Sequence, residues 1–265
     1  LGVIESAIEH LHGAGIDAIN VDLMYGLPGQ SVDHVVRSAE AMLALEPDRF
    51  AVFGYAHVPW FKKHQRAIDE SRLPGGTERL AQAEAVAETL AGAGYAAIGL
   101  DHFARPDDPL AKAQAHGKLR RNFQGYTVDP ASALIGFGAS SIGSLRHGFI
   151  QNEPHLGRYE EAVAAGRLPI VRGLALSDED RQRSTIIEML MCNLEVDIGA
   201  VCGASAAGIR TGAWSRLSEM QDDGLVEIDG SRVRMTPDGR PYVRNVAACF
   251  DAYHQGAPSR HSRAV

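Results

Sequence analysis

The sequence predicts an α/β fold with a parallel sheet, followed by a helical, winged-helix-like C-terminal domain. Two observations carry this prediction. Helical and extended apolar patterns alternate over the first 100 residues, which is typical of β-α-β units. After residue 176, two helical patterns precede a pair of short extended stretches, and helices followed by a two-stranded wing resemble a winged-helix module.

The first third of the chain predicts three helices and three strands, at residues 1–14, 31–45 and 77–91 for the helices and 18–24, 50–55 and 95–100 for the strands. Ser31 is a suitable cap for the second helix. Because a crossover helix separates successive strands, we expect parallel pairing.

Polar residues lie in or directly after these strands, namely Asp22, the Tyr55-Ala56-His57 turn and the Asp101-His102 pair. The carboxyl ends of parallel strands carry the active sites of α/β sheets and barrels. Asp22 stands inside an apolar strand, where a carboxylate is costly to bury unless it is paired. It either caps a neighbouring turn or binds a ligand.

The middle of the chain is irregular and rich in glycine. Residues 105–109 open a short helix that is expected to end near Gly117. The strip that follows, residues 118–127, is basic and amide-bearing, and it is either a solvated surface strand or an anion site. Residues 135–143 form a turn of small residues that lets a ligand approach the backbone closely.

A change in composition at residues 167–172 predicts a domain boundary, with one domain at 1–170, a second at 171–254 and a disordered tail at 255–265. Ser177 and Asp180 form a capping box for a helix that runs to Asn193. A further helix is expected at 206–222. A hairpin then turns through Asp229-Gly230 as a type I′ turn, and a final helix begins at Thr236-Pro237 and runs to about residue 253.

Composition excludes several classes of protein. The 265 residues carry 26 Lys and Arg against 33 Asp and Glu, a net charge of −7, which disfavours non-specific nucleic-acid binding. No apolar run approaches the length that spans a bilayer, and no secretory leader is present, so we expect no membrane partner. The three cysteines, Cys192, Cys202 and Cys249, have no metal-binding spacing, and we expect a free-thiol protein of the cytoplasm.

Several exact strings identify the chain further. Residues 20–30, NVDLMYGLPGQ, resemble the fifth-strand motif of coproporphyrinogen-type radical S-adenosylmethionine (SAM) enzymes. Within that group, the strings YAH at 55–57, DHFARPDD at 101–108 and RNFQGYT at 121–127 resemble the oxygen-independent coproporphyrinogen III oxidase (dehydrogenase) family. The resemblance runs in order from about residue 1 to residue 253.

The resemblance implies an incomplete (β/α)6 radical-SAM barrel followed by a helical C-terminal domain. Enzymes of this family hold a 4Fe-4S cluster on a C-x-x-x-C-x-x-C loop after the first strand, and neither that loop nor the first four strands is present here. We therefore expect this chain to be the C-terminal part of the enzyme, with the cluster ligands upstream and no activity by itself.

The resemblance also implies roles for single residues. Asp22 matches the aspartate that contacts the second SAM molecule, and Ala56 and Ile142 match positions that contact the first. Neither Ala56 nor Ile142 has a polar side chain, so backbone groups or van der Waals contacts would serve there.

The family reaction is the oxidative decarboxylation of two propionate side chains of coproporphyrinogen III to the vinyl groups of protoporphyrinogen IX, in anaerobic haem biosynthesis. It implies an electron donor and an electron acceptor as partners, and we expect a monomer. Because the substrate carries several carboxylates and the chain is acidic overall, we expect a local cluster of Arg or Lys side chains that binds those carboxylates. The candidates are Arg105, Lys118, Arg120 and Arg121.

Two other functions are open. The first is a haem chaperone of the same superfamily, which binds haem without decarboxylation and would share the Asp22 strand but not the strings at 101–108 and 121–127. The second is a nucleic-acid binder that uses the winged helix. This second function is disfavoured because residues 206–221 contain only Arg210 and Arg216 as cations.

Overall fold

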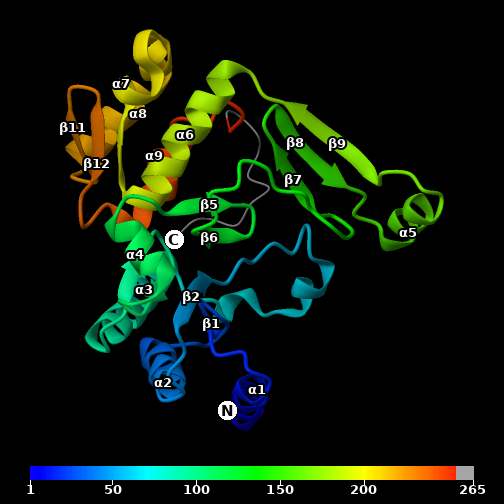
Figure 1. Ribbon diagram of the computed structural model, residues 1–265. Coiled ribbons are helices and arrows are strands. Elements are labelled where there is room, and N and C mark those ends of the chain that lie inside the picture. Colours follow the sequence, from blue (N-terminus) through cyan, green and yellow to red (C-terminus); the bar gives the residue numbers. More distant parts are fainter. Residues whose placement is uncertain (255–265) are drawn as a thin grey trace. The chain divides into compact units, whose positions relative to one another are not determined.

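The computed structural model describes residues 1–254, which form two compact units, residues 1–119 with His254 and residues Arg120–Tyr253 (Figure 1). The predicted disordered tail, residues 255–265, lies outside the described residues. No helix in the described part of the chain is both long and apolar enough to span a membrane.

The first unit alternates helices and strands as predicted. Its elements are α1 (Gly2–Gly13), β1 (Asn20–Tyr25), α2 (Val32–Leu43), β2 (Arg49–Gly54), the 3-10 turns η1 (Lys63–Ala67) and η2 (Glu70–Arg72), α3 (Gly76–Gly92), β3 (Ala96–Ile98), β4 (His102–Ala104) and α4 (Pro109–Ala115). Ser31 caps α2 as expected, and its hydroxyl accepts a hydrogen bond from the backbone N–H of His34.

The sheet of the first unit has the strand order β1-β2-β4-β3. β1 and β2 are parallel, which confirms the predicted β-α-β unit. The third predicted strand does not continue the parallel pattern, because β4 is inserted between β2 and β3 and is antiparallel to both. The chain reverses between β3 and β4 at Gly99, whose φ of 54° favours glycine.

The two faces of this sheet differ. Val21, Leu23, Tyr25, Phe50 and Phe103 pack with α2 and α3 into the core of the unit. The opposite face, here called the distal face, carries the alternate residues of the strands. Its members include Asn20, Asp22, Met24, Phe53 and His102.

The described part of the second unit contains eight short strands, all paired antiparallel, and five helices, of which α6 and α8 are the longest. Its elements are β5 (Arg120–Asn122), β6 (Gly125–Thr127), β7 (Ile142–Leu145), β8 (Gly148–Asn152), α5 (Leu156–Ala164), β9 (Ile170–Ala175), α6 (Asp178–Asn193), β10 (Glu195–Asp197), α7 (Ile198–Cys202), η3 (Gly203–Ser205), α8 (Ala206–Asp222), β11 (Val226–Asp229), β12 (Arg232–Met235), η4 (Arg240–Tyr242) and α9 (Val243–Ala248).

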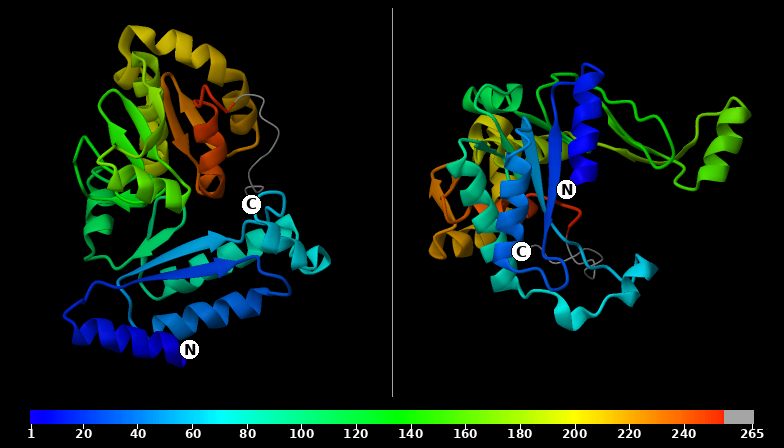
Figure 2. Two further views of the ribbon diagram at one scale, coloured as in Figure 1. Left: turned by 90° about the vertical axis from the view of Figure 1, so that its right-hand side faces the viewer. Right: turned by 90° about the horizontal axis from the view of Figure 1, so that it is seen from below.

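Three sheets divide these strands. β5 and β6 form a hairpin, β7-β8-β9 form an antiparallel sheet, and β10-β12-β11 form a second three-stranded sheet. The β7-β8-β9 sheet extends away from α6 and carries α5 at its far end, as two views show (Figure 2). The predicted hairpin is present as β11 and β12, and a third strand, β10, pairs with β12.

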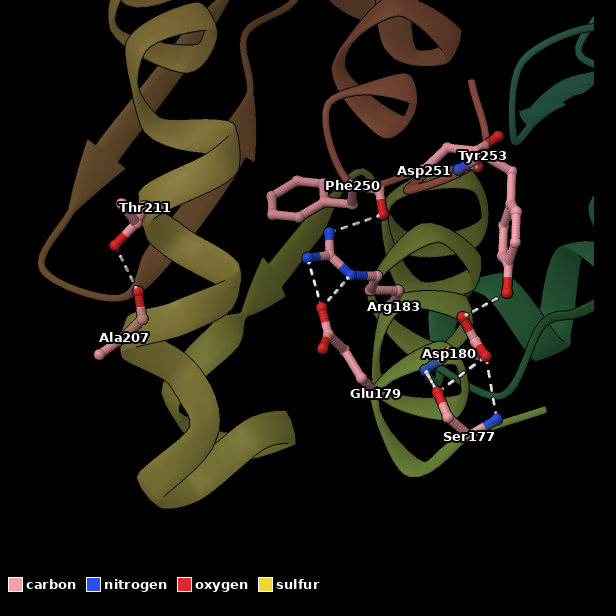
Figure 3. Close-up of polar contacts among 9 residues, drawn as sticks. All are labelled: Ser177, Glu179, Asp180, Arg183, Ala207, Thr211, Phe250, Asp251 and Tyr253. Atoms are coloured by element: carbon pink, nitrogen blue, oxygen red, sulfur yellow. Dashed lines mark hydrogen bonds and ion pairs between the residues drawn. The ribbon is translucent and has the colours of Figure 1, made fainter. Parts of the chain in front are cut away.

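Polar contacts at the start of α6 hold the end of the described chain (Figure 3). Ser177 and Asp180 form the predicted capping box. Arg183 pairs with Glu179 and also donates to the Phe250 carbonyl at 3.1 Å. The Tyr253 hydroxyl donates to Asp180 at 3.2 Å, so the segment after α9 is fixed against the first turns of α6.

Two C-terminal predictions are corrected. Asp229 pairs with Arg232, so the hairpin turns through Gly230-Ser231 rather than Asp229-Gly230. The final helix begins at Val243 rather than at Thr236, and it ends at Ala248. The delay has a local cause: the N–H of Thr236 donates to the Leu225 carbonyl, and its hydroxyl accepts from the N–H of Gly239, which holds these residues in a turn.

The division between units also differs from the boundary predicted near residue 170. Residues 120–170 group with the C-terminal part of the chain. The β5–β6 hairpin contacts α6, since Arg120 pairs with Glu188 and the Tyr126 hydroxyl donates to the Met191 carbonyl at 2.9 Å. A change in composition does not report such contacts, which join residues more than 60 positions apart.

Candidate functional site

Asp22 lies in β1 on the distal face of the first sheet, with its side chain exposed. Its Oδ1 accepts a hydrogen bond of 2.7 Å from Nδ2 of Asn20, two positions earlier on the same face. The carboxylate caps no turn or helix in the described structure. A strand carboxylate that is both exposed and oriented by a neighbouring amide is able to accept further hydrogen bonds from a ligand.

Apolar and aromatic side chains share this face with Asp22. Met24 and Phe53 are neighbours in the register of β1 and β2, with 48% and 36% of their surfaces exposed. Phe53 meets the His102 ring edge-on at 6.2 Å, and His102 Nδ1 lies 2.7 Å from Oδ1 of Asp101. The distal face thus combines a carboxylate, an oriented imidazole and exposed apolar surface.

The loop after β1 is clamped by Gln82 of α3, a residue that is completely buried. Its Oε1 accepts from the N–H of Gly26 at 2.9 Å, and its Nε2 donates to the Gln30 carbonyl at 2.6 Å. Both ends of the loop at residues 26–30 are therefore fixed to one helix.

Arg79, one turn before Gln82, holds the end of β2. Its Nη1 donates to the Tyr55 carbonyl at 2.9 Å, and its guanidinium lies 5.9 Å from the centre of the Tyr25 ring. A Cβ at Gly54 would stand 2.7 Å from Nη2 of Arg79, so a larger residue here would displace the Arg79 guanidinium. The carboxyl ends of β1 and β2 are thus joined through α3.

Ala56 lies two residues after the end of β2 and is exposed. The buried Gln65 donates through Nε2 to the Ala56 carbonyl at 3.0 Å, and its Oε1 accepts from the N–H of Val58 at 2.6 Å. The backbone at Ala56, which the resemblance assigns to SAM contact, is therefore held by a side chain nine residues later.

Ile142 belongs to the second unit, at the start of β7, and is half-buried. The glycines around it serve the chain itself. A Cβ at Gly136 would lie 2.8 Å from Cβ of Ser141, and a Cβ at Gly143 would lie 3.0 Å from the Leu134 carbonyl oxygen. These two glycines therefore permit close packing of the backbone, a reason other than the ligand approach expected from sequence.

The basic strip is a hairpin rather than a single strand, and its two arginines point to different partners. Arg120 donates through Nε to Glu188 at 2.8 Å, and this hydrogen bond raises the pKa of Arg120 above its ordinary value. Arg121 is exposed, and its guanidinium lies 5.6 Å from the centre of the Tyr126 ring. In the described part of the chain, no carboxylate lies within ion-pair distance of the Arg121 guanidinium.

Lys118 and Arg105 belong to the first unit, and their settings differ. Lys118 is exposed between α4 and β5. Arg105 lies at the amino end of β2, where its guanidinium donates to the Glu46 carbonyl at 2.9 Å. A hydrogen bond with Tyr95 raises the pKa of Arg105, and both residues line a shallow pocket of about 400 Å³. Arg105 thus holds the turn before β2, on the edge of the sheet opposite to Ala56.

The three cysteines are buried and free. Burial raises the pKa of the Cys192 thiol to about 12, and it also raises those of Cys202 and Cys249. Within residues 1–254, no group of three or more His, Cys, Asp or Glu side chains is arranged to hold a metal ion.

Sequence reasoning missed the residues that hold the site, namely Gln65, Arg79 and Gln82. One signal was available for Gln82: it stands four and eight positions before the buried Val86 and Leu90, on the apolar stripe of α3. A buried polar side chain on such a stripe needs hydrogen-bond partners, so its presence indicates a structural clamp.

Comparisons with known proteins agree with this architecture. A model of the HemN C-terminal domain matches residues 176–242. An oxygen-independent coproporphyrinogen III oxidase of Bradyrhizobium diazoefficiens is 49% identical, over 98% of this chain and 58% of that protein. An oxygen-independent coproporphyrinogen III oxidase of Thermostichus vulcanus is 41% identical, over 96% of this chain and 79% of that protein.

A solved structure is also similar. Coproporphyrinogen III oxidase (HemN) from Escherichia coli, described as a radical SAM enzyme, superposes with a TM-score of 0.88 at 35% identity. The match covers 94% of this chain and 58% of that one. The chain therefore spans 58% of the length both of this structure and of the Bradyrhizobium protein.

Proposed function

This chain belongs to the oxygen-independent coproporphyrinogen III oxidase family, and from that premise we propose that it forms the part of a radical-SAM enzyme that helps to hold SAM and coproporphyrinogen III. The proposed reaction is the oxidative decarboxylation of two propionates to the vinyl groups of protoporphyrinogen IX. The observation that carries the proposal is the exposed carboxylate of Asp22, which Asn20 orients on the distal face.

Asp22 is proposed to accept hydrogen bonds from the ribose hydroxyls or the ammonium group of the second SAM molecule. Ala56 and Ile142 are proposed to contact the first SAM molecule through the backbone or through van der Waals packing. The support for Ala56 is its position two residues after the end of β2, with the carbonyl held by Gln65. Bound SAM would supply the hydrogen-abstracting chemistry, while these residues bind it, orient it and exclude water.

The described residues do not fit a 4Fe-4S cluster. Cys192 lies in α6, Cys202 ends α7 and Cys249 follows α9, and each thiol is buried at a different element. A cluster needs several thiolates that face one another. We therefore assign the cluster ligands to residues outside this chain, and no step is assigned to a cluster here.

We also propose how the two parts of the chain are built, as part of a barrel and as a C-terminal domain. In this view, β1 is the fifth strand of an incomplete (β/α)6 barrel and the distal face is the barrel interior. Residues 171–254 form a winged-helix-like domain, which the three-stranded β10-β12-β11 sheet beside α8 supports. The protein is proposed to act as a cytoplasmic monomer with an electron donor and an electron acceptor.

Arg121 and Lys118 remain the proposed cations for substrate propionates. Arg121 is exposed beside the Tyr126 ring. Its guanidinium is thus placed to bind a propionate carboxylate while the aromatic ring contacts the apolar tetrapyrrole. Arg120 is paired with Glu188, and Arg105 holds backbone carbonyls at the opposite edge of the first sheet. We therefore leave both Arg105 and Arg120 out of the proposed substrate site.

The experiment is an anaerobic turnover assay on the complete protein that carries this chain. With SAM and a reductant, it should convert coproporphyrinogen III to protoporphyrinogen IX with release of CO2. Haem loading of the same protein tests the haem-chaperone alternative. Stoichiometric haem binding without decarboxylation would overturn the proposed reaction in favour of a chaperone.

A further inference from the structure

The segment between β2 and η2 carries an exposed group of cations and aromatic rings at residues 60–66, which lie outside both the strings that carry the resemblance and the basic strip. We propose that residues 57–66, here called the cationic loop, bind propionate carboxylates of the tetrapyrrole substrate. This inference rests on the proposed function for the identity of the ligand. It adds a substrate-binding surface in the first unit.

The charge of the cationic loop contrasts with that of the chain. The whole sequence has a net charge of −7, yet no Asp or Glu occurs from residue 49 to residue 68. Within that stretch the loop places Lys62, Lys63 and Arg66, together with two histidines, all within ten residues. A local concentration of cations on an acidic protein is able to attract and hold a polyanionic ligand.

The lysines and the arginine of the cationic loop form no ion pairs with neighbouring acidic side chains in the described part of the chain. Across residues 1–254, no carboxylate forms an ion pair with Lys62, Lys63 or Arg66. The two acids that follow the loop have other partners: Glu70 lies 3.1 Å from Nε2 of His57, and Asp69 accepts from the hydroxyl of Ser71 at 2.7 Å. The exposed ammonium groups of Lys62 and Lys63 are thus accessible to the carboxylates of a ligand.

The aromatic residues of the loop are exposed beside these charges. Trp60 has 55% and Phe61 has 72% of its surface accessible. The ammonium of Lys62 lies 5.1 Å from the centre of the Phe61 ring. A tetrapyrrole would pack its apolar ring system against Trp60 and Phe61. The propionate carboxylates at the edge of the tetrapyrrole would then reach the lysines.

The loop is held in place rather than loosely attached. Gln65 is buried and bonds both the Ala56 carbonyl and the N–H of Val58, which closes the loop at its base. Arg66 donates through Nε to the Pro59 carbonyl at 3.3 Å. Further on, the Arg72 carbonyl accepts from the N–H of Gly29, which ties the end of the segment to the loop after β1. Because the loop is already ordered before a ligand binds, the entropic cost of binding is lower.

The position of the loop fits substrate binding. It leaves the carboxyl end of β2, directly after Ala56, the residue proposed to contact SAM. Gln65 bonds the backbone of Ala56 itself, so the proposed cofactor contact and the cations belong to one braced segment. Ligands of parallel α/β sheets bind at this edge.

The test compares Lys62→Ala/Lys63→Ala with Arg37→Ala/Lys112→Ala in the complete protein. The control removes two exposed cations of the same unit, from α2 and α4, and leaves the net charge of the two variants equal. We expect the first variant to raise KM for coproporphyrinogen III tenfold or more and to leave KM for SAM unchanged. Lys62→Glu/Lys63→Glu should raise it further. The control should match the wild type.

A binding measurement separates this inference from the proposed function. Coproporphyrin III, the stable oxidised tetracarboxylate, should quench tryptophan fluorescence of the wild-type protein. Because the chain contains two tryptophans, Trp60 and Trp214, Trp60→Phe should remove most of the quenching contributed by this chain. Lys62→Ala/Lys63→Ala should weaken the binding at least tenfold and make it less dependent on salt.

The outcomes are distinct. If the wild type turns over coproporphyrinogen III and the lysine variant has an unchanged KM and unchanged coproporphyrin affinity, the cationic loop is not a propionate site and the proposed function stands. If the wild type shows no turnover but the lysine variant loses coproporphyrin III binding, the proposed reaction fails and the loop is confirmed as a tetrapyrrole-carboxylate site.

Discussion

The fully buried side chain of Gln82 accepts a hydrogen bond of 2.9 Å from the backbone N–H of Gly26, across 56 positions of sequence. The same amide donates to the Gln30 carbonyl. Gly26 has a φ of 83°, so the chain leaves β1 through a left-handed residue, and one helix side chain holds that turn. The loop after the Asp22 strand is therefore ordered by α3 together with its own Gln30, whose side chain donates to the Met24 carbonyl at 3.0 Å.

Gln82→Leu tests this clamp. The variant leaves the buried N–H of Gly26 without its partner, which costs about 1–3 kcal/mol. We expect a lower melting temperature and faster hydrogen exchange in the peptide at residues 25–31, measured by mass spectrometry. Gln221→Leu, an exposed position at the end of α8, is the matched control and should change stability by less than about 0.5 kcal/mol. Unchanged exchange at residues 25–31 would show that the loop is held by other contacts.

Helix starts were predictable because their signals are local. Ser31 and the Ser177–Asp180 capping box each lie within four residues of the helix that they begin, and both were placed correctly. The β3–β4 hairpin was not predicted, because strands of three residues are too short to show a period. The delayed start of α9 was likewise missed, since it depends on the contact of Thr236 with Leu225.

In the candidate site, too, features set by local sequence were predictable and those set by contacts between distant residues were not. The position of Asp22 in a strand and of Ala56 just after one follows from local pattern, and the structure confirms both. The clamps by Gln65 and Gln82, and the pairing of Arg120 with Glu188, join residues far apart in sequence. A single sequence does not show which distant side chain a polar residue meets, so the distinct settings of Arg120 and Arg121 needed the structure.

Asp22→Asn should impair use of SAM with little effect on folding. The exchange is nearly isosteric and the side chain is exposed, but it removes a charge whose hydrogen bonds are worth about 1.5–3 kcal/mol each. We expect a rise in KM for SAM of about tenfold or more in the complete protein. Asp17→Asn, an exposed carboxylate before β1, is the control. Full turnover and unchanged SAM affinity in Asp22→Asn would assign Asp22 a structural role.

The Cys192 thiol should remain unreactive in the folded protein. Burial raises its pKa from an ordinary value of 9.0 to about 12, so almost no thiolate exists at pH 8. We expect iodoacetamide at pH 8 to label Cys192 only after denaturation, with peptide mass spectrometry as the readout. Labelling at a rate typical of an exposed cysteine would contradict the buried setting.

The same pKa shift makes stability depend on pH. Above pH 9 the unfolded chain loses the Cys192 proton, whereas the folded chain keeps it until about pH 12. The unfolded state then binds fewer protons, so the free energy of unfolding falls as pH rises through this window. Cys192→Ala should show a shallower decline between pH 9 and 10.5 in urea titrations than the wild type does. An equal slope in both proteins would mean that other groups control the decline.

Anaerobic reconstitution of the 265-residue chain with iron and sulfide should yield no stoichiometric 4Fe-4S cluster. The three cysteines lie in separate buried settings, and residues 1–254 contain no group arranged to hold a metal. The complete protein should bind one cluster under the same conditions. Iron and sulfide analysis with absorbance spectroscopy provides the measurement, and a stable cluster on the short chain would refute our assignment of the ligands to another part of the protein.

Arg121→Ala and Arg120→Ala should have different effects, because adjacent strand residues point to opposite sides. Arg121 is exposed over the Tyr126 ring, and its loss should raise KM for coproporphyrinogen III tenfold or more, about 1.4 kcal/mol, while SAM cleavage persists. Arg120 pairs with Glu188, with 49% and 29% of the two side chains exposed. Its loss should cost about 0.2–1 kcal/mol of stability and leave KM unchanged. Glu188→Ala breaks the same pair and also removes the acceptor of the Arg121 N–H, so it should cost more stability than Arg120→Ala and likewise leave KM unchanged. A rise in KM for Arg120→Ala alone would reverse the assignment of the two faces. If neither variant raises KM, the hairpin is solvated surface and the propionates are held elsewhere.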